Sequence, residues 1–174
     1  MKGYFIQQES VGLRQIEVFD KSAFLQWHND SKMREKIGGI FPFNSNTFQE
    51  ICHLSNQTYP ANMWFAVCEY DRLVGIAGLH NIKYIQKNAE IAVFIGDEPN
   101  RRKGIGKTVL RLIEQYAFGT LDLHRLYALV YSDNAIALDF FRSVGWKKEG
   151  VMQEAAFWNY QFRDVVIYSI LNQV

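Results

Sequence analysis

Hydrophobic and polar positions follow two different periods along the chain, and these separate strands from helices. Short β-prone runs between turn residues predict strands, while apolar residues three and four positions apart predict helices. Strands are expected at 11–16, 63–69, 73–82, 88–95, 125–131, 146–157 and 161–171. Helices are expected after Asp20, after Asn46, over 105–119 and over 134–143, with Asp20 as an N-cap. This order, with one strand–helix–strand crossover at its centre, predicts an α+β fold.

Composition narrows the class of protein. The chain has 174 residues, of which 48% are hydrophobic and 15% aromatic, so we expect one compact domain over residues 1–174. A net charge of +1 points to neither nucleic acid nor an anionic membrane. Cys52 and Cys68 fit a reducing compartment, and no apolar stretch suggests a signal peptide or membrane span, so a cytoplasmic protein is expected. The histidines and cysteines lack metal-ligand spacing, and we expect no metal.

A basic, glycine-containing loop stands between the expected strand at 88–95 and the helix after it. Its sequence is Arg101-Arg102-Lys103-Gly104-Ile105-Gly106-Lys107. Glycines let the backbone close around a phosphate, and a helix start favours negative charge. The loop therefore predicts a site for a pyrophosphate-bearing ligand, the alternative being a basic turn that only connects two elements. A nucleotide-binding P-loop does not fit, because Arg101 stands where its first glycine is required.

Three motifs, taken together, resemble the GNAT acetyltransferases. RRKGIG at 101–106 is similar to the family's loop for the pyrophosphate of acetyl-CoA. Asn134-Ala135-Ile136-Ala137, followed by residues 140–146, resembles its Asn-x-x-Ala-x-x-x-Tyr-x-x-x-Gly-Phe element. The tail from Glu149-Gly150 to Arg163-Asp164 is similar to the RimJ/RimL-type and spermidine acetyltransferase branch. The resemblance implies a single GNAT-like domain with a mostly antiparallel, mixed sheet of six to seven strands and about four helices.

The resemblance also implies a cofactor site. Acetyl-CoA would be the co-substrate, and the backbone of Val93, Phe94 and Ile95 would pair with its pantetheine arm. Its pyrophosphate would lie on the loop residues Arg101, Arg102, Lys103, Gly104, Ile105, Gly106 and Lys107. Asn134 would hydrogen-bond the pantetheine arm or the thiol region.

The implied reaction is direct acetyl transfer to a primary amine. Glu90 is our candidate for the base, with Glu154 and His80 as alternatives. The family's tyrosine, often proposed to protonate the departing thiolate, is replaced here by Phe141, which cannot donate a proton. This replacement leaves a second hypothesis open, a catalytically inactive acyl-CoA-binding module.

The acceptor is not defined by the sequence. In the family, residues 29–60 usually form the acceptor side of the cleft, and here aromatic, acidic and basic residues alternate in that range. A small-molecule amine and a protein N-terminus both remain open. The edge of the last hairpin leaves a homodimer open as well.

Overall fold

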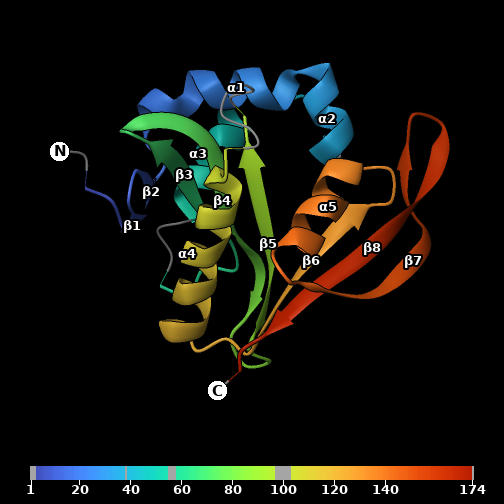
Figure 1. The fold of residues 1–174 in the computed structure, drawn as a ribbon. Helices are drawn as coiled ribbons and strands as arrows, with labels where there is room; N and C mark the ends of the chain where they lie inside the picture. Colours follow the sequence, from blue (N-terminus) through green and yellow to red (C-terminus); the bar gives the residue numbers. More distant parts are fainter. Residues whose placement is uncertain (1–2, 38, 55–57, 97–102, 174) are drawn as a thin grey trace.

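The computed structural model describes residues 3–37, 39–54, 58–96 and 103–173. Its strands are β1 (Ile6–Gln8), β2 (Val11–Arg14), β3 (Met63–Glu69), β4 (Arg72–Lys83), β5 (Asn88–Ile95), β6 (Arg125–Tyr131), β7 (Lys147–Trp158) and β8 (Gln161–Leu171). Its helices are the 3-10 helix η1 (Val18–Asp20) and α1 (Lys21–Asn29), α2 (Ser31–Ile37), α3 (Ser45–Leu54), α4 (Ile105–Gly119) and α5 (Ala135–Ser143). Figure 1 shows their arrangement.

The strands form one mixed sheet in the order β1-β2-β3-β4-β5-β6-β8-β7. Neighbouring strands are antiparallel except β5 and β6, which are parallel and joined through α4. A parallel pair needs such a crossover, because its strands run in the same direction. The α+β class, the mostly antiparallel sheet and the central crossover expected from the sequence are therefore confirmed.

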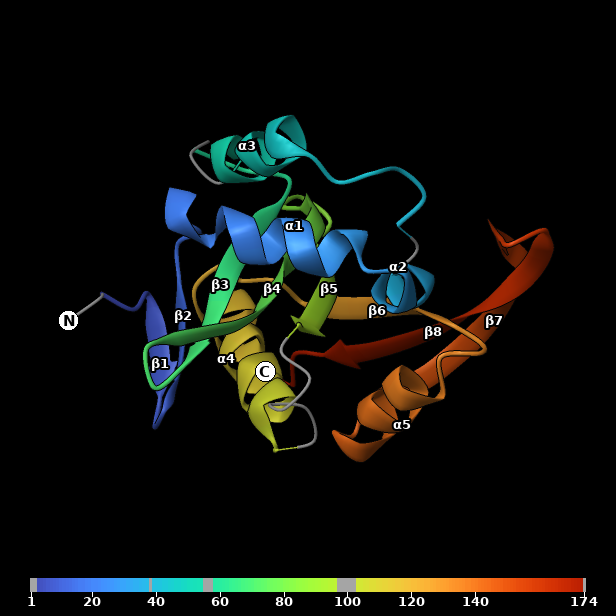
Figure 2. The same cartoon turned by 90° about the horizontal axis from the view of Figure 1, so that it is seen from above.

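Helices cover both faces of the sheet, as Figure 2 shows from above, with α1 and α3 on one side and α4 and α5 on the other. The buried face of α4 includes Ile105, Val109 and Ile113, spaced four residues apart, and packs into the main core. On the opposite face, Phe24 of α1 and Phe48 of α3 meet edge to face in a smaller core, with ring centroids 5.4 Å apart. Strand side chains alternate between these two cores.

Three details differ from the sequence prediction. Strand β1 was not expected, and it raises the sheet to eight strands. Helix α2 was also not expected in a polar stretch; the side chain of Asp30 caps it by accepting from the Met33 N–H at 2.9 Å. Asp20 does precede α1, but its side chain does not cap that helix. Its carboxylate instead accepts two hydrogen bonds of 2.7 Å from the Arg14 guanidinium.

Candidate active site

The two central parallel strands, β5 and β6, separate after their first three residue pairs. The ladder between β5 and β6 ends at the pair Glu90 and Tyr127, after three pairs of residues. Val93, Phe94 and Ile95 continue to pair with β4 on their other side. Within the described ladder, residues 91–94 of β5 thus have no partner on β6. This opening presents backbone N–H and C=O groups that an extended ligand could bind.

The N-terminus of α4 follows this opening in the chain. Gly104 precedes the helix in a left-handed conformation with φ of 88°, which favours glycine. The carbonyl of Gly104 accepts from the N–H groups of Lys107 and Thr108 at 2.9 and 3.1 Å. The N–H groups before Lys107 have no acceptor within the helix, as at any helix start. No acidic residue lies in the first turn of α4, and Lys103 and Lys107 are exposed beside it, so this end of the helix favours an anion.

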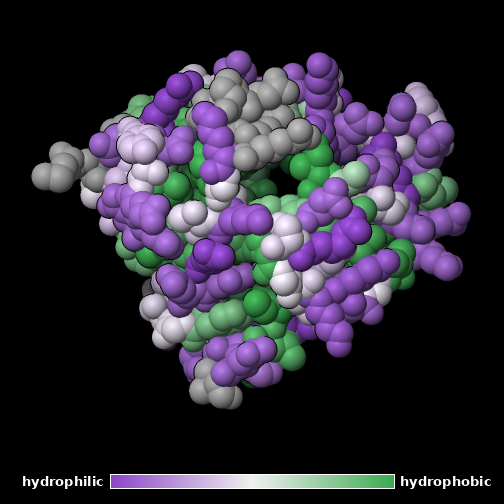
Figure 3. Space-filling model, in the orientation of Figure 1, coloured by the Kyte–Doolittle hydropathy of each residue, from purple (hydrophilic) through white to green (hydrophobic). Residues whose placement is uncertain are grey.

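The start of α4 lies close to α5. A Cβ atom placed on Gly106 would stand 3.3 Å from the ring of Phe140. In the orientation of Figure 1, Figure 3 shows the surface hollowed beside the space between α4 and α5, with hydrophobic residues at the edge of the hollow. The separated strands, the glycine-rich helix start and this hollow lie in the same part of the molecule.

Glu90, the predicted base, lies at the point where β5 and β6 separate. It is half-buried and pairs with His80 of β4 on one side and Tyr127 of β6 on the other. Its Oε2 accepts a hydrogen bond of 3.1 Å from the side-chain amide of Asn81. Burial, and then the charge of Glu90, raise the pKa of the Tyr127 hydroxyl. Sequence reasoning missed Asn81 and Tyr127, because neither lies in a recognisable motif.

His80, an alternative base, is adjacent to Glu90 but differs from it in environment. Its ring packs on Trp64, with centroids 4.9 Å apart, and its Nε2 atom is buried without a hydrogen-bond partner among the described residues. Burial lowers the pKa of the imidazole, while the nearby Glu90 charge partly opposes that shift. Glu154, the other alternative, is exposed in β7 of the last hairpin.

Asn134 and Phe141, both from the Asn134 motif, support the structure around α5. The Asn134 side chain caps α5 by accepting from the Ala137 N–H at 3.2 Å. Phe141 is only 6% exposed and packs in the core between Trp146 and Tyr168, with ring centroids 5.0 and 5.6 Å away. The position of the family's tyrosine is therefore filled by a buried hydrocarbon ring.

A group of aromatic side chains packs between α1 and the end of β5. His28 stacks on Phe43 at a centroid distance of 4.4 Å, and its ring lies 6.0 Å from that of Phe94 in β5. Trp27 also contacts Phe94, at 6.0 Å. Asn29 holds the Phe43 backbone in place by donating to its carbonyl at 2.8 Å and accepting from its N–H at 2.9 Å. The range 29–60, expected on the acceptor side, thus contacts the end of β5 indirectly, because Phe43 stacks on His28 and His28 lies beside Phe94.

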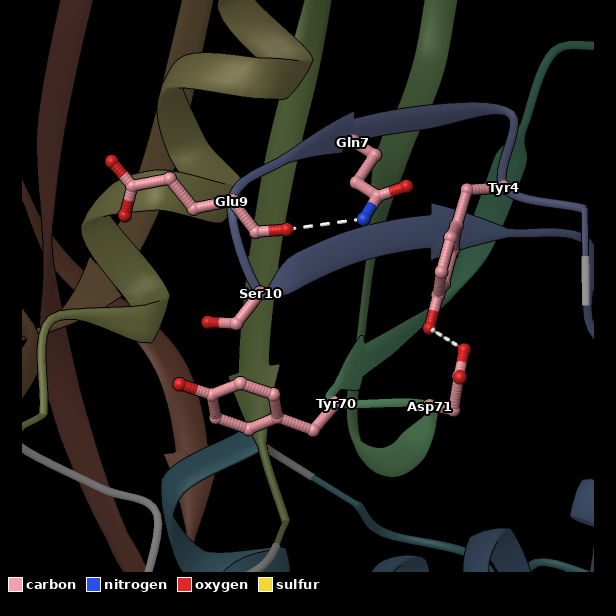
Figure 4. A pocket seen from close by; sticks show the side chains of 6 residues that line it. All are labelled: Tyr4, Gln7, Glu9, Ser10, Tyr70 and Asp71. Carbon is pink, nitrogen blue, oxygen red and sulfur yellow. Dashed lines mark hydrogen bonds between the residues drawn. The ribbon is translucent and has the colours of Figure 1, made fainter. Parts of the chain in front are cut away.

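A separate cavity of about 400 Å³ lies at the opposite edge of the sheet, as Figure 4 shows. It is lined by Tyr4, Gln7, Glu9, Ser10, Tyr70 and Asp71. The Tyr4 hydroxyl donates to Asp71 at 2.7 Å, and its pKa is raised to about 12 by burial and by that carboxylate. Strands β3 and β4 separate this edge from β5, so the cavity is not part of the opening described above.

Some sequence predictions fall outside what the structure describes or stay untested. Arg101 and Arg102, predicted to bind pyrophosphate, lie outside the described residues. Within the described ranges, His, Cys, Asp and Glu side chains form no cluster of three or more that could hold a metal. None of the helices in those ranges has the length and apolar character that a membrane crossing requires.

Comparison with known proteins identifies the family. A model of the acetyltransferase (GNAT) domain matches residues 13–167. The spermidine N(1)-acetyltransferase of Vibrio cholerae is 29% identical over 141 residues, which are 79% of this chain and 81% of that protein. The putative ribosomal N-acetyltransferase YdaF of Bacillus subtilis is 30% identical over 101 residues, 58% of this chain and 55% of that protein.

A solved structure shows the same fold. The structure of Vibrio cholerae spermidine N-acetyltransferase in complex with CoA and spermine superimposes with a TM-score of 0.83 and 26% identity, over 93% of this chain and 95% of that chain. The non-catalytic alternative is not supported by these relatives, which are named as acetyltransferases. Because the family model spans most of the chain, this protein belongs to the GNAT acetyltransferase family and is an N-acetyltransferase that moves an acetyl group to an amine.

Proposed function

We propose that this protein, as one GNAT domain over residues 1–174, transfers the acetyl group of acetyl-CoA directly to the primary amine of a small molecule. One observation carries the proposal. The only parallel strand pair in the described sheet opens immediately after a half-buried carboxylate, Glu90, and β5 then leads into a glycine-containing helix start. Acetyl-CoA lying in that opening would reach Glu90 with its thioester and the start of α4 with its pyrophosphate.

Backbone groups would bind acetyl-CoA. The backbone of Val93, Phe94 and Ile95 would pair with the amides of the pantetheine arm, as an added strand does. The N–H groups at the start of α4 would receive the pyrophosphate, and Gly104, whose Cβ position is open, would let it approach. The cations of the loop, from Arg101 to Lys107, would strengthen the attraction.

The chemistry requires little beyond alignment and one proton transfer. The neutral amine attacks the thioester carbonyl, an N–C bond forms, and the C–S bond breaks to release the CoA thiolate. The nitrogen then carries a surplus proton, which Glu90 accepts directly or through one water molecule. Phe141 cannot act as an acid, so we propose that the thiolate leaves without a protein proton donor, since its basicity is low.

The acceptor proposed is a small-molecule amine, in line with the named activity of the Vibrio cholerae relative. Three acidic side chains that could attract a cationic amine already have arginine neighbours. Asp133 and Glu35 lie 3.0 and 3.8 Å from the Arg163 guanidinium. Glu149 accepts from both terminal nitrogens of Arg125. A polyamine would therefore compete with these arginines, so spermidine and simple monoamines must be compared directly.

The test combines binding and turnover. Calorimetry should give micromolar binding of acetyl-CoA and no binding of ATP–Mg. Release of free thiol is then measured with spermidine, short monoamines and a peptide with a free N-terminus. Glu90→Gln should bind acetyl-CoA like the wild type and lower kcat about 100-fold with the best amine. Unchanged kcat in that variant would remove Glu90 from the mechanism, and turnover of the peptide alone would overturn the proposed acceptor class.

A further inference from the structure

A β-bulge interrupts β4 beside the candidate base, Glu90. The register between β4 and β5 shifts between His80 and Lys83. Within this bulge Asn81 has a left-handed backbone, with φ of 52°. Asparagine tolerates this conformation better than most residues. The Asn81 N–H donates to the side chain of Asn62 at 3.1 Å. This hydrogen bond ties the bulge to the residue that immediately precedes β3.

The bulge changes the direction of one side chain. In a regular strand, neighbouring residues point to opposite faces of the sheet, so Asn81 would point away from the side of His80. In the bulge, both residues interact with Glu90. His80 stands opposite it in the ladder, and the Asn81 amide donates to its Oε2 at 3.1 Å. Bulges that redirect a side chain in this way recur next to active sites.

We propose that Asn81 is a positioning residue, whose amide holds the Glu90 carboxylate so that Oε2 is occupied and Oε1 receives the proton of the acceptor amine. This inference rests on the proposed role of Glu90 as the base.

The other titratable groups near Glu90 do not replace the Asn81 amide as a hydrogen-bond donor to its carboxylate. The pKa of His80 on β4 is lowered by burial, which favours its neutral form. Tyr127 on β6 has a raised pKa and stays neutral as well. Arg125, on the same strand as Tyr127, is engaged with Glu149. The Asn81 amide is a donor whose protonation does not change with pH.

The test is Asn81→Gly, which keeps a backbone compatible with the bulge and removes the amide. We expect kcat to fall about tenfold, the size of one hydrogen bond to a charged group, with the KM for acetyl-CoA within twofold of wild type. Asn81→Asp keeps the size of the side chain, but an ionised carboxylate cannot donate a hydrogen bond, so this variant should lower kcat at least as much.

A matched control comes from Asn159, which also has a positive φ, 49°, but lies in the turn of the β7–β8 hairpin. Asn159→Gly should leave kcat unchanged. The melting temperature of each variant is measured alongside, because a purely structural role of Asn81 would lower stability and would lower kcat equally in the wild-type and Glu90→Gln backgrounds. That result would overturn the inference.

A double variant separates the inference from the function on which it rests. In the Glu90→Gln background, Asn81→Gly should have no further effect on kcat. If Glu90→Gln alone leaves kcat unchanged, the role of Glu90 fails and the inference fails with it. If Glu90→Gln lowers kcat while Asn81→Gly leaves kcat unchanged, Glu90 keeps its role and the positioning role of Asn81 is wrong.

Discussion

Gly106 in the first turn of α4 lies against the ring of Phe140 in α5, so closely that an added Cβ atom would be 3.3 Å from Cε2. This contact brings the helix that starts at the candidate pyrophosphate site up to the helix that begins at Asn134. The close approach of α4 to α5 therefore depends on the small size of one residue.

Gly106→Val should push Phe140 away and weaken acetyl-CoA binding by about tenfold or more, since overpacking costs ~1–3 kcal/mol. Adding Phe140→Ala should restore part of the affinity by making room. Calorimetric titration of wild type, the two single variants and the double variant checks this. If Gly106→Val lost as much affinity with Phe140→Ala as without it, the contact would not be the cause.

Gly104 offers a second test of the loop. Gly104→Glu forces a side chain into a backbone with φ of 88° and places a negative charge at the helix start, so acetyl-CoA binding should be lost. Gly104→Asn is the control, because asparagine accepts positive φ and carries no charge, and its affinity should stay within a few-fold of wild type. Near-normal affinity of Gly104→Glu would show that the pyrophosphate lies elsewhere.

The buried ion pair between Arg14 and Asp20 predicts a loss of stability rather than of activity. Their side chains are only 5% and 1% exposed. Asp20→Ala would leave the guanidinium buried without its carboxylate, which should cost about 3–5 kcal/mol in the free energy of unfolding. The double variant Arg14→Met with Asp20→Ala should cost less than the sum of the two single changes. Urea denaturation measures all three, and additive costs would contradict the pairing.

Glu149 should make the stability depend on pH in the acid range. Its carboxylate accepts from Arg125 and from the Ser169 hydroxyl, and these bonds lower its pKa from 4.5 to about 2. A carboxyl with a depressed pKa adds stability above its unfolded value, and this contribution is lost as the pH falls from 4.5 towards 2. The difference in melting temperature between wild type and Glu149→Gln should therefore be constant above about pH 5.5 and shrink below about pH 4.5. A constant difference down to about pH 2.5 would contradict it.

Most strands could be predicted because turn residues bound them clearly. The predicted ranges 88–95, 125–131 and 161–171 match β5, β6 and β8. Strand β1 escaped prediction because it has three residues, two of them glutamines. Helix α2 escaped because six of its seven residues remain outside the core; only Met33 is buried. An apolar pattern cannot mark an element that buries one side chain.

The candidate site divides in the same way. The glycine loop was proposed from a local motif and Glu90 from its place on the strand that leads to it, and both assignments stay predictions. Only the family resemblance pointed to the backbone of Val93, Phe94 and Ile95, because β5 and β6 both have ordinary β patterns and their separation is a tertiary feature. Asn81 was missed because a bulge interrupts the alternation on which strand patterns rest.

The opening after Glu90 has a consequence for hydrogen exchange. Backbone amides of residues 91–94 that point towards β6 lack a strand partner in the described ladder and should exchange with solvent faster than those bonded to β4. If acetyl-CoA binds as an added strand, it should slow exchange at these alternate residues only. Saturation at about 100 times Kd would also raise the free energy of unfolding by about 2.7 kcal/mol. The enzyme would then be most rigid at the centre of its sheet only while it holds its co-substrate.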